Sequence, residues 1–247
     1  METPIVEMTP IVEMKRIYKN FGNVKALQNV DLTLKRKEIL GLVGDNAAGK
    51  STIMNILFGV YPPDAGELFI EGKKIKMKSP LDARRLKLEK IHQDYALVPT
   101  LNVAENIFLG REITKLRIIE REKMINKSKE ILKTMGIQID DLKRKVSDYS
   151  GGQQQAIAIA KAILFNPNVL IMDEPTANMS LKHVKKLHEL ITKFRRNGIS
   201  IIYITHRLRD VLSVSDRIMV LRAGKKVGEK ICKKTSLREI VDLMMGI

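Results

Sequence analysis

One stretch of the sequence combines residue types that bind phosphate. An apolar run over residues 38–43 predicts a buried strand, and apolar residues at helical spacing predict a helix over residues 51–58. The segment that joins them has the pattern G-x-x-x-x-G-K-S of a phosphate-binding loop (P-loop), made of Gly44, Asp45, Asn46, Ala47, Ala48, Gly49, Lys50 and Ser51, with Thr52 directly after it. In such a loop, backbone N–H groups and the helix N-terminus surround phosphate oxygens. Lys50 would reach the β- and γ-phosphates and the Ser51 hydroxyl would bind Mg²⁺, which predicts a nucleoside triphosphate site.

Two carboxylates follow a second apolar stretch. Residues 169–172 predict a buried strand that ends at Asp173 and Glu174. At the tip of this strand, Asp173 could hold Mg²⁺ through water, and Glu174 could polarise an attacking water. Acidic residues after a strand also form ordinary turns, so the pair alone does not establish hydrolysis.

A second candidate anion site precedes a helix that we expect from residue 154 to residue 165. Ser150 can cap this helix, and the glycines after it leave backbone N–H groups bare. The complete stretch is Tyr149-Ser150-Gly151-Gly152-Gln153.

Composition indicates a globular protein. The 247 residues are 44% hydrophobic and 29% charged, and no apolar run approaches the about 18 residues that span a bilayer. No secretory signal is visible at the start, and the lone Cys232 suits a reducing compartment, so we expect a cytoplasmic protein. The net charge of +16 could attract nucleic acid or an anionic membrane face. Because the basic residues are scattered and no aromatic residues interleave with them, a solvated lysine-rich surface is the simpler interpretation.

The order of the expected elements predicts an α/β fold. Short strands at 11–18, 30–34 and 68–70 suggest an N-terminal antiparallel β subdomain, and a charged helical region follows at 81–145. Strand–helix alternation then predicts a core of mostly parallel strands with both faces covered, made from residues 11–80 and 146–230. A closing helix occupies 231–247. Residues 3–8 are repeated letter for letter as residues 9–14, so we expect residues 1–10 to be a disordered duplicate.

The stretch from Tyr149 to Gln153 resembles the S-G-G-Q signature of the ABC ATPases, in which Leu usually stands where this chain has Tyr149. The family resemblance implies a P-loop NTPase core and a head-to-tail pair of ATPase domains. The signature of one domain would close over the γ-phosphate held by the P-loop of the other, so four residues would act in trans: Ser150, Gly151, Gly152 and Gln153.

The same resemblance assigns four more residues. It implies that Gln93 reaches the metal and the attacking water, that His206 contacts the γ-phosphate, and that Phe21 stacks on adenine, with Tyr18 as a weaker candidate. It also exposes departures from the family pattern. Ser180 stands where many relatives have an aspartate, and Ala47 replaces a common glycine, which should be tolerated unless that position needs a positive φ.

Residues 59–66, 97–99 together with 103–112, and 202–208 look like those of importers for simple sugars such as ribose, galactose and xylose. The resemblance implies an ATPase subunit on the cytoplasmic face of the membrane, driving a separate permease and served indirectly by a solute-binding protein. An uncharged run over residues 95–101 could dock that permease, although Leu97 and Leu101 could equally be core residues. Most such relatives fuse two ATPase domains in one chain, so a homodimer and a fragment both remain open.

Three alternatives differ in function. The cargo could be a purine nucleoside. A soluble ABC protein acting on nucleic acid or ribosomes would suit the charge, but a long coiled-coil insertion and a second ATPase domain with a basic linker are missing from this sequence, so we expect no nucleic-acid partner. A P-loop small-molecule kinase would leave residues 149–153 unexplained.

Overall fold

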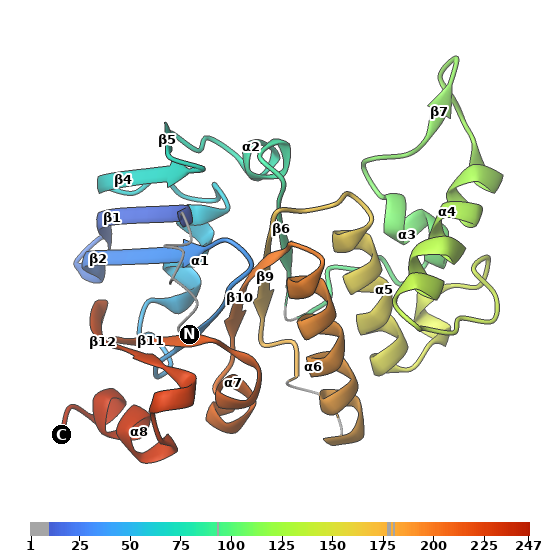
Figure 1. Ribbon diagram of the computed structural model, residues 1–247. Coiled ribbons are helices and arrows are strands. Elements are labelled where there is room, and N and C mark those ends of the chain that lie inside the picture. Colours follow the sequence, from blue (N-terminus) through green and yellow to red (C-terminus); the bar gives the residue numbers. More distant parts are fainter. Residues whose placement is uncertain (1–9, 93, 177–178, 180) are drawn as a thin grey trace, which may run out of the picture.

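The computed structural model describes residues 10–92, 94–176, 179 and 181–247. Within these ranges, an antiparallel sheet has the strand order β2-β1-β4-β5 (Figure 1) and contains β1 (Pro10–Phe21), β2 (Val24–Lys35), β4 (Ala65–Ile70) and β5 (Lys73–Ile75). The expected disordered duplicate lies outside the described residues except for Pro10, which begins β1 opposite Lys35. Proline is tolerated at the first residue of a strand because its missing N–H interrupts no ladder there.

A second sheet forms the centre of the molecule. Its order is β12-β11-β3-β10-β9-β6, and all neighbours are parallel except β11 and β12. The six strands are β3 (Ile39–Val43), β6 (Leu88–Ile91), β9 (Val169–Asp173), β10 (Ser200–Ile204), β11 (Arg217–Arg222) and β12 (Lys225–Ile231). Every residue of β3 and β10 is buried, as expected for apolar strands covered on both faces.

Side chains on the two faces of this sheet enter two separate hydrophobic clusters. In β3, Ile39 and Val43 join one cluster while Leu40 and Leu42 join the other, because successive side chains point to opposite faces. The first cluster, which we call the helical core, takes in α5 (Gly151–Ile163), α6 (Leu181–Arg196), α7 (Leu208–Val214) and α8 (Leu237–Met245). The second, the β core, takes in the antiparallel sheet and α1 (Lys50–Leu57).

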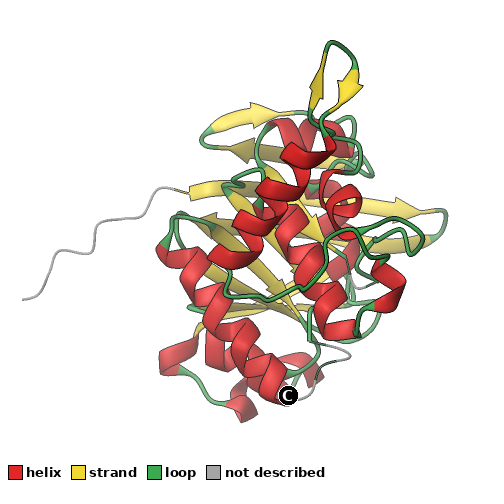
Figure 2. Cartoon of the chain, turned by 90° about the vertical axis from the view of Figure 1, so that its right-hand side faces the viewer, coloured by secondary structure: helices red, strands yellow, loops and turns green. Residues whose placement is uncertain are grey.

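The helical core extends to α3 (Val103–Phe108) and α4 (Arg121–Thr134), which lie beside α5 (Figure 1). Between them projects a short hairpin of β7 (Thr114–Lys115) and β8 (Ile118–Ile119). Viewed from the side on which α3, α4 and α5 lie, the helices lie in front of the strands (Figure 2). None of the helices within the described ranges is both long and apolar enough to cross a membrane.

The predicted helical character of residues 81–145 needs a correction at its start. After the short α2 (Pro80–Arg85), β6 pairs in parallel with β9 and is the edge strand of the central sheet. The sequence of β6 hides this role because Glu89 and Lys90 interrupt its apolar residues. Both charges are paired in the fold, Glu89 with Arg111 and Lys90 with Asp173, and the strand itself is held by its backbone pairing with β9.

Candidate functional site

The predicted P-loop lies between β3 and α1, and two of its glycines are required by close contacts. Gly44 has a φ of +152° and Gly49 a φ of +102°. A Cβ at Gly44 would lie 2.2 Å from the Leu221 carbonyl oxygen, and one at Gly49 would lie 2.8 Å from Leu27 Cδ2. Ala47, which stands where relatives often have glycine, has a φ of +66°. This position therefore does need a positive φ, the case in which we expected the alanine to be poorly tolerated. The alanine is held in a left-handed conformation that costs about 1–2 kcal/mol relative to glycine.

The side chain of Lys50 folds back over the loop that precedes it. Its Nζ donates hydrogen bonds to the carbonyl oxygens of Gly44 (2.6 Å) and Asp45 (2.8 Å). Burial lowers the pKa of Lys50, and the charge of Glu174 opposes this shift. The ammonium thus lies next to the loop that would bind phosphate. A phosphate group could replace the two carbonyl oxygens that now accept its hydrogen bonds.

The two predicted acidic residues occupy different positions at the end of the central sheet. Asp173 ends β9, while Glu174 leaves the strand with a φ of +50° and donates its N–H to the Ile204 carbonyl. Glu174 Oε1 accepts a hydrogen bond from the His206 N–H (3.0 Å), and Oε2 lies 2.9 Å from His206 Nδ1. Such strained residues cluster at active sites but also occur in ordinary turns of this chain, such as Lys37 and Glu71.

The geometry leaves Glu174 with acceptor capacity. Among the described residues, Oε2 is buried and has no hydrogen-bond partner of good geometry, although the imidazole lies within ion-pair distance. The His206 side chain next to this oxygen is 65% exposed to solvent. A water molecule could therefore donate to Glu174, which is what a general base requires.

One open cavity of about 630 Å³ brings most of these groups together. Its lining combines the P-loop from Asn46 to Thr52 with Asp173, Glu174 and Phe21. Phe21 also packs edge-to-face on Tyr61, with ring centroids 5.3 Å apart, whereas Tyr18 is not among the described lining residues. Sequence patterns did not indicate the remaining lining residues, which come from β2, from the end of β10 and from the turn between β11 and β12: Val24, Lys25, Ala26, Gln28, Ile204 and Ala223.

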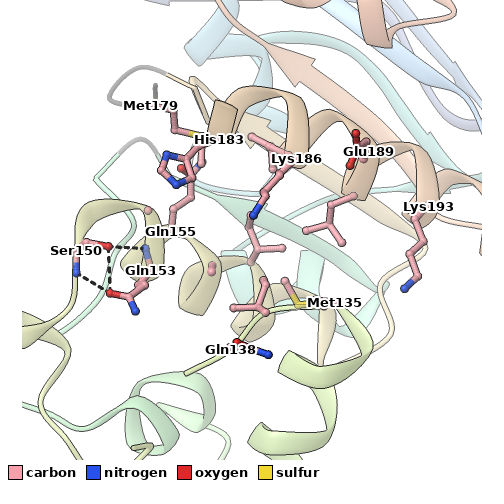
Figure 3. A pocket seen from close by; sticks show the side chains of 17 residues that line it. Met135, Gln138, Ser150, Gln153, Gln155, Met179, His183, Lys186, Glu189 and Lys193 are labelled. Carbon is pink, nitrogen blue, oxygen red and sulfur yellow. Dashed lines mark hydrogen bonds between the residues drawn. The ribbon is translucent and has the colours of Figure 1, made fainter. Parts of the chain in front are cut away.

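The Ser150–Gln153 stretch lies apart from this cavity. Ser150 caps α5 in a reciprocal pair: its Oγ accepts the Gln153 N–H at 3.4 Å, and Gln153 Oε1 accepts the Ser150 N–H at 3.1 Å. A Cβ added at Gly151 or Gly152 would meet no described atom within 4 Å. Ser150, Gly152 and Gln153 instead border a cavity of about 500 Å³ between α5 and α6 (Figure 3). The described residues that line the P-loop cavity include none of these four.

Tyr149, the departure from the family signature, is buried. Its hydroxyl donates to the Asp141 carbonyl, and the Arg144 guanidinium lies 5.5 Å from the ring centroid. The larger side chain thus has a polar partner for its hydroxyl, which explains how it replaces leucine beside Ser150.

Gln93 and Ser180 lie outside the described residues, so the role predicted for Gln93 stays a prediction. In the uncharged run beyond Gln93, Leu97 is half-buried and packs against the helical core. The Val98 N–H donates to the buried Asn106 side chain at 2.7 Å. The run is therefore anchored to α3, and Tyr95 and Ala96 border a small cavity of about 60 Å³ next to Lys161.

The donor set fits a magnesium ion that is shared with a nucleotide. Among the described residues, no cluster of three or more His, Cys, Asp or Glu side chains could hold a metal by itself. Mg²⁺ at phosphate sites takes only one or two protein oxygens and completes its shell with phosphates and water. Ser51 and Asp173, which both line the P-loop cavity, offer a hydroxyl and a carboxylate of this kind.

Comparisons with known proteins agree with this geometry. A family model described as ABC transporter matches residues 27–177. The xylose/arabinose import ATP-binding protein XylG of Sulfolobus acidocaldarius is 41% identical over 96% of this chain and 94% of that protein. The ribose import ATP-binding protein RbsA of Caldanaerobacter subterraneus subsp. tengcongensis is 42% identical over 97% of this chain, which spans only 48% of its length.

Solved structures give the same fold. The ADP conformation of MJ1267, an ATP-binding cassette of an ABC transporter, has a TM-score of 0.83 and 26% identity, covering 97% of this chain and all of that one. The cassette MJ0796, solved as a dimer, has a TM-score of 0.79 and 27% identity, with 91% of this chain and all of that one covered.

Proposed function

Because this chain belongs to the ABC transporter family, we propose that it is the ATP-hydrolysing subunit of an importer that drives uptake of a simple sugar through a separate membrane permease. The cavity that Glu174 and the P-loop line together carries this proposal, because it joins a candidate general base to a phosphate-binding loop. Relatives named for import of ribose and of xylose or arabinose support the sugar as cargo.

The proposed reaction depends on positioning and charge. Lys50 exchanges its two carbonyl partners for the β- and γ-phosphates of ATP, and the adenine stacks on Phe21. Ser51 and Asp173 would hold Mg²⁺, which when bound neutralises phosphate charge. Glu174 takes the proton of an attacking water, while the exposed His206 side chain contacts the γ-phosphate. Gln93 is assigned to the metal and the water on the family resemblance alone.

A Glu174→Gln variant tests this reaction. The amide cannot take up the proton, so turnover should fall by about 10²–10⁴-fold while ATP binding persists. ATP binding is measured by calorimetry and hydrolysis by phosphate release. Glu130→Gln, an exposed change on α4, is the matched control and should keep both properties. Near-normal hydrolysis in Glu174→Gln would remove this residue from the mechanism, and loss of ATP binding would give it a structural role.

We further propose a head-to-tail pair of ATPase domains. Ser150, Gly152 and Gln153 border a different cavity from the P-loop, and a similar cassette has been solved as a dimer, so the stretch from Ser150 to Gln153 would complete the site of a second domain. Sedimentation of the Glu174→Gln protein with ATP should give a dimer that reverts to monomer without nucleotide. A protein that stays monomeric at high concentration would indicate that its mate is a different domain, as the double-length RbsA relatives suggest.

The permease is proposed to bind the run at residues 95–101 on the cytoplasmic face of the membrane, with a solute-binding protein delivering the sugar outside. A charged residue at Leu97 would disturb the helical core, against which Leu97 packs, so Val98→Asp is a better test than Leu97→Asp. It should leave ATPase activity of the isolated subunit intact while permease binding and transport fail. Unchanged transport would place the docking site elsewhere. Uptake assays that compare pentoses with a purine nucleoside decide between the two classes of cargo.

A further inference from the structure

A buried lysine bridges the P-loop helix and the end of β9. The side chain of Lys90, in β6, is only 5% exposed. Its Nζ lies 3.2 Å from Asp173 Oδ2 and donates a hydrogen bond to Asn55 Oδ1 at 3.2 Å. Asn55 belongs to α1, the helix that begins at Lys50. One ammonium therefore connects the carboxylate proposed for the metal to the helix that follows the phosphate loop.

The fold does not need this charge at this position. β6 is held against β9 by backbone pairing, with Lys90 opposite Ile171. Taking an ammonium out of water costs several kcal/mol, which the attraction of one carboxylate only partly repays. An apolar side chain would cover the edge of the sheet without that penalty. The side chain is therefore better explained by its effect on Asp173 than by packing.

Asp173 has two oxygens, and Lys90 lies at hydrogen-bond distance from one of them. The carboxylate is 15% exposed and borders the P-loop cavity, so its other oxygen is the one available toward the nucleotide. A cation next to a carboxylate repels a second cation that approaches the same group and so weakens its binding there. Lys50 adds a second ammonium nearby, since the charge of Asp173 acts on it.

We propose that Lys90 is a positioning residue of the magnesium site, whose charge acts through Asp173 to weaken the binding of the divalent cation there. The inference rests on the proposed role of Asp173 in holding Mg²⁺. In this arrangement Lys90 sets the Mg²⁺ concentration at which nucleotide becomes tightly bound. It acts through Asp173 and touches neither nucleotide nor metal.

The test measures how strongly Mg²⁺ improves nucleotide binding. For the full chain, dissociation constants of a non-hydrolysable ATP analogue are measured by calorimetry in EDTA and in saturating Mg²⁺. The constant in EDTA divided by the constant in Mg²⁺ gives the coupling between ion and nucleotide, so a higher ratio means that Mg²⁺ improves nucleotide binding more. Lys90→Met should raise this ratio by about tenfold because the competing charge is gone. Lys90→Arg keeps the charge and should stay near wild type, as should Lys73→Met, an exposed control on β5.

The possible outcomes separate this inference from the function on which it rests. If Asp173→Asn leaves the ratio unchanged, Asp173 does not hold the ion. In that case both the proposed magnesium role of Asp173 and the inference about Lys90 fail. If Asp173→Asn lowers the ratio but Lys90→Met leaves it unchanged or lowers it, only the inference about Lys90 is overturned. Circular dichroism establishes that each variant is folded. Should Lys90→Met not fold, Lys90→Gln removes the charge while keeping a hydrogen-bond donor, and the same rise is required of it.

Discussion

Replacement of Arg217 by methionine is expected to destabilise the protein more than removal of an exposed ion pair, because it leaves a buried carboxylate without its partner. Arg217, in β11, donates from Nε to Glu38 Oε1 (2.8 Å) and from Nη2 to Glu38 Oε2 (2.9 Å). Nη2 also donates to the Thr33 carbonyl at 2.6 Å, and Nη1 to Glu229. One guanidinium thus joins β2, the start of β3 and β12.

The magnitude follows from burial. The Glu38 side chain is 5% exposed, and breaking a buried ion pair by removing one partner costs about 3–5 kcal/mol. Arg217 and Glu229 retain some contact with water, which places the expected loss at the lower end, about 3 kcal/mol. For a chain of this size, each kcal/mol lowers the melting temperature by about 2–4 °C, so a fall of about 6–12 °C is expected.

Urea unfolding followed by circular dichroism measures the loss. Arg195→Met is the matched control: its pair with Asp216 has side chains 38% and 32% exposed, so it should cost less than about 1 kcal/mol. Adding Glu38→Gln to Arg217→Met should recover part of the stability, because the unpaired charge is then also removed. A loss below about 1 kcal/mol for Arg217→Met would refute the reasoning. So would a double variant whose loss of stability equals the sum of the losses of Arg217→Met and Glu38→Gln alone.

Ala47, Gly41 and Cys232 give simpler tests. Ala47→Gly relieves the positive φ and should stabilise the chain by about 0.5–1 kcal/mol in urea, whereas a loss would show that the strain is absent. Gly41→Ala would put its Cβ 2.3 Å from Val211 Cγ1 and should lower the free energy of unfolding by about 1–3 kcal/mol. Adding Val211→Ala should recover part of this loss. Full stability in Gly41→Ala alone would contradict this packing. Burial raises the pKa of Cys232 to about 11, so a thiol reagent at pH 8 should label it slowly until the protein is unfolded, and rapid labelling of the native chain would contradict the burial.

The parts of the site that are local in sequence were predictable. The strand, loop and helix around Lys50 follow from apolar spacing and from a motif in which each residue has its own task, and the structure confirms β3 and α1 there. The strand predicted over residues 169–172 is confirmed as β9, because a short, uninterrupted apolar run is typical of a buried strand. Family resemblance, rather than local pattern, brought Phe21 and His206 into consideration, and both lie beside the P-loop groups.

Features that depend on distant contacts were not predictable. No local signal in β6 shows that Lys90 will meet Asp173, since eighty-odd residues separate them and a charged strand resembles a helix turn. The left-handed conformation of Ala47 could be stated only as a condition, because alanine itself carries no preference for it. The turn around Ala223 reaches the P-loop through the Gly224 N–H and the Ala48 carbonyl, a contact set by the arrangement of strands.

The separation of the helical core from the β core by a single sheet gives the molecule two interiors. Among the described residues, the side chains that support α1 belong to one interior and those that support α5 to the other, with the strands alternating between them. Cooperative openings of a protein tend to follow such contiguous units, so the α5 side can loosen while the packing beneath α1 persists. Amide exchange in the native protein would then fall into two tiers of protection, divided along the plane of the sheet. Heat or mutation could soften the segment that carries Ser150 and still leave the phosphate loop on a rigid base.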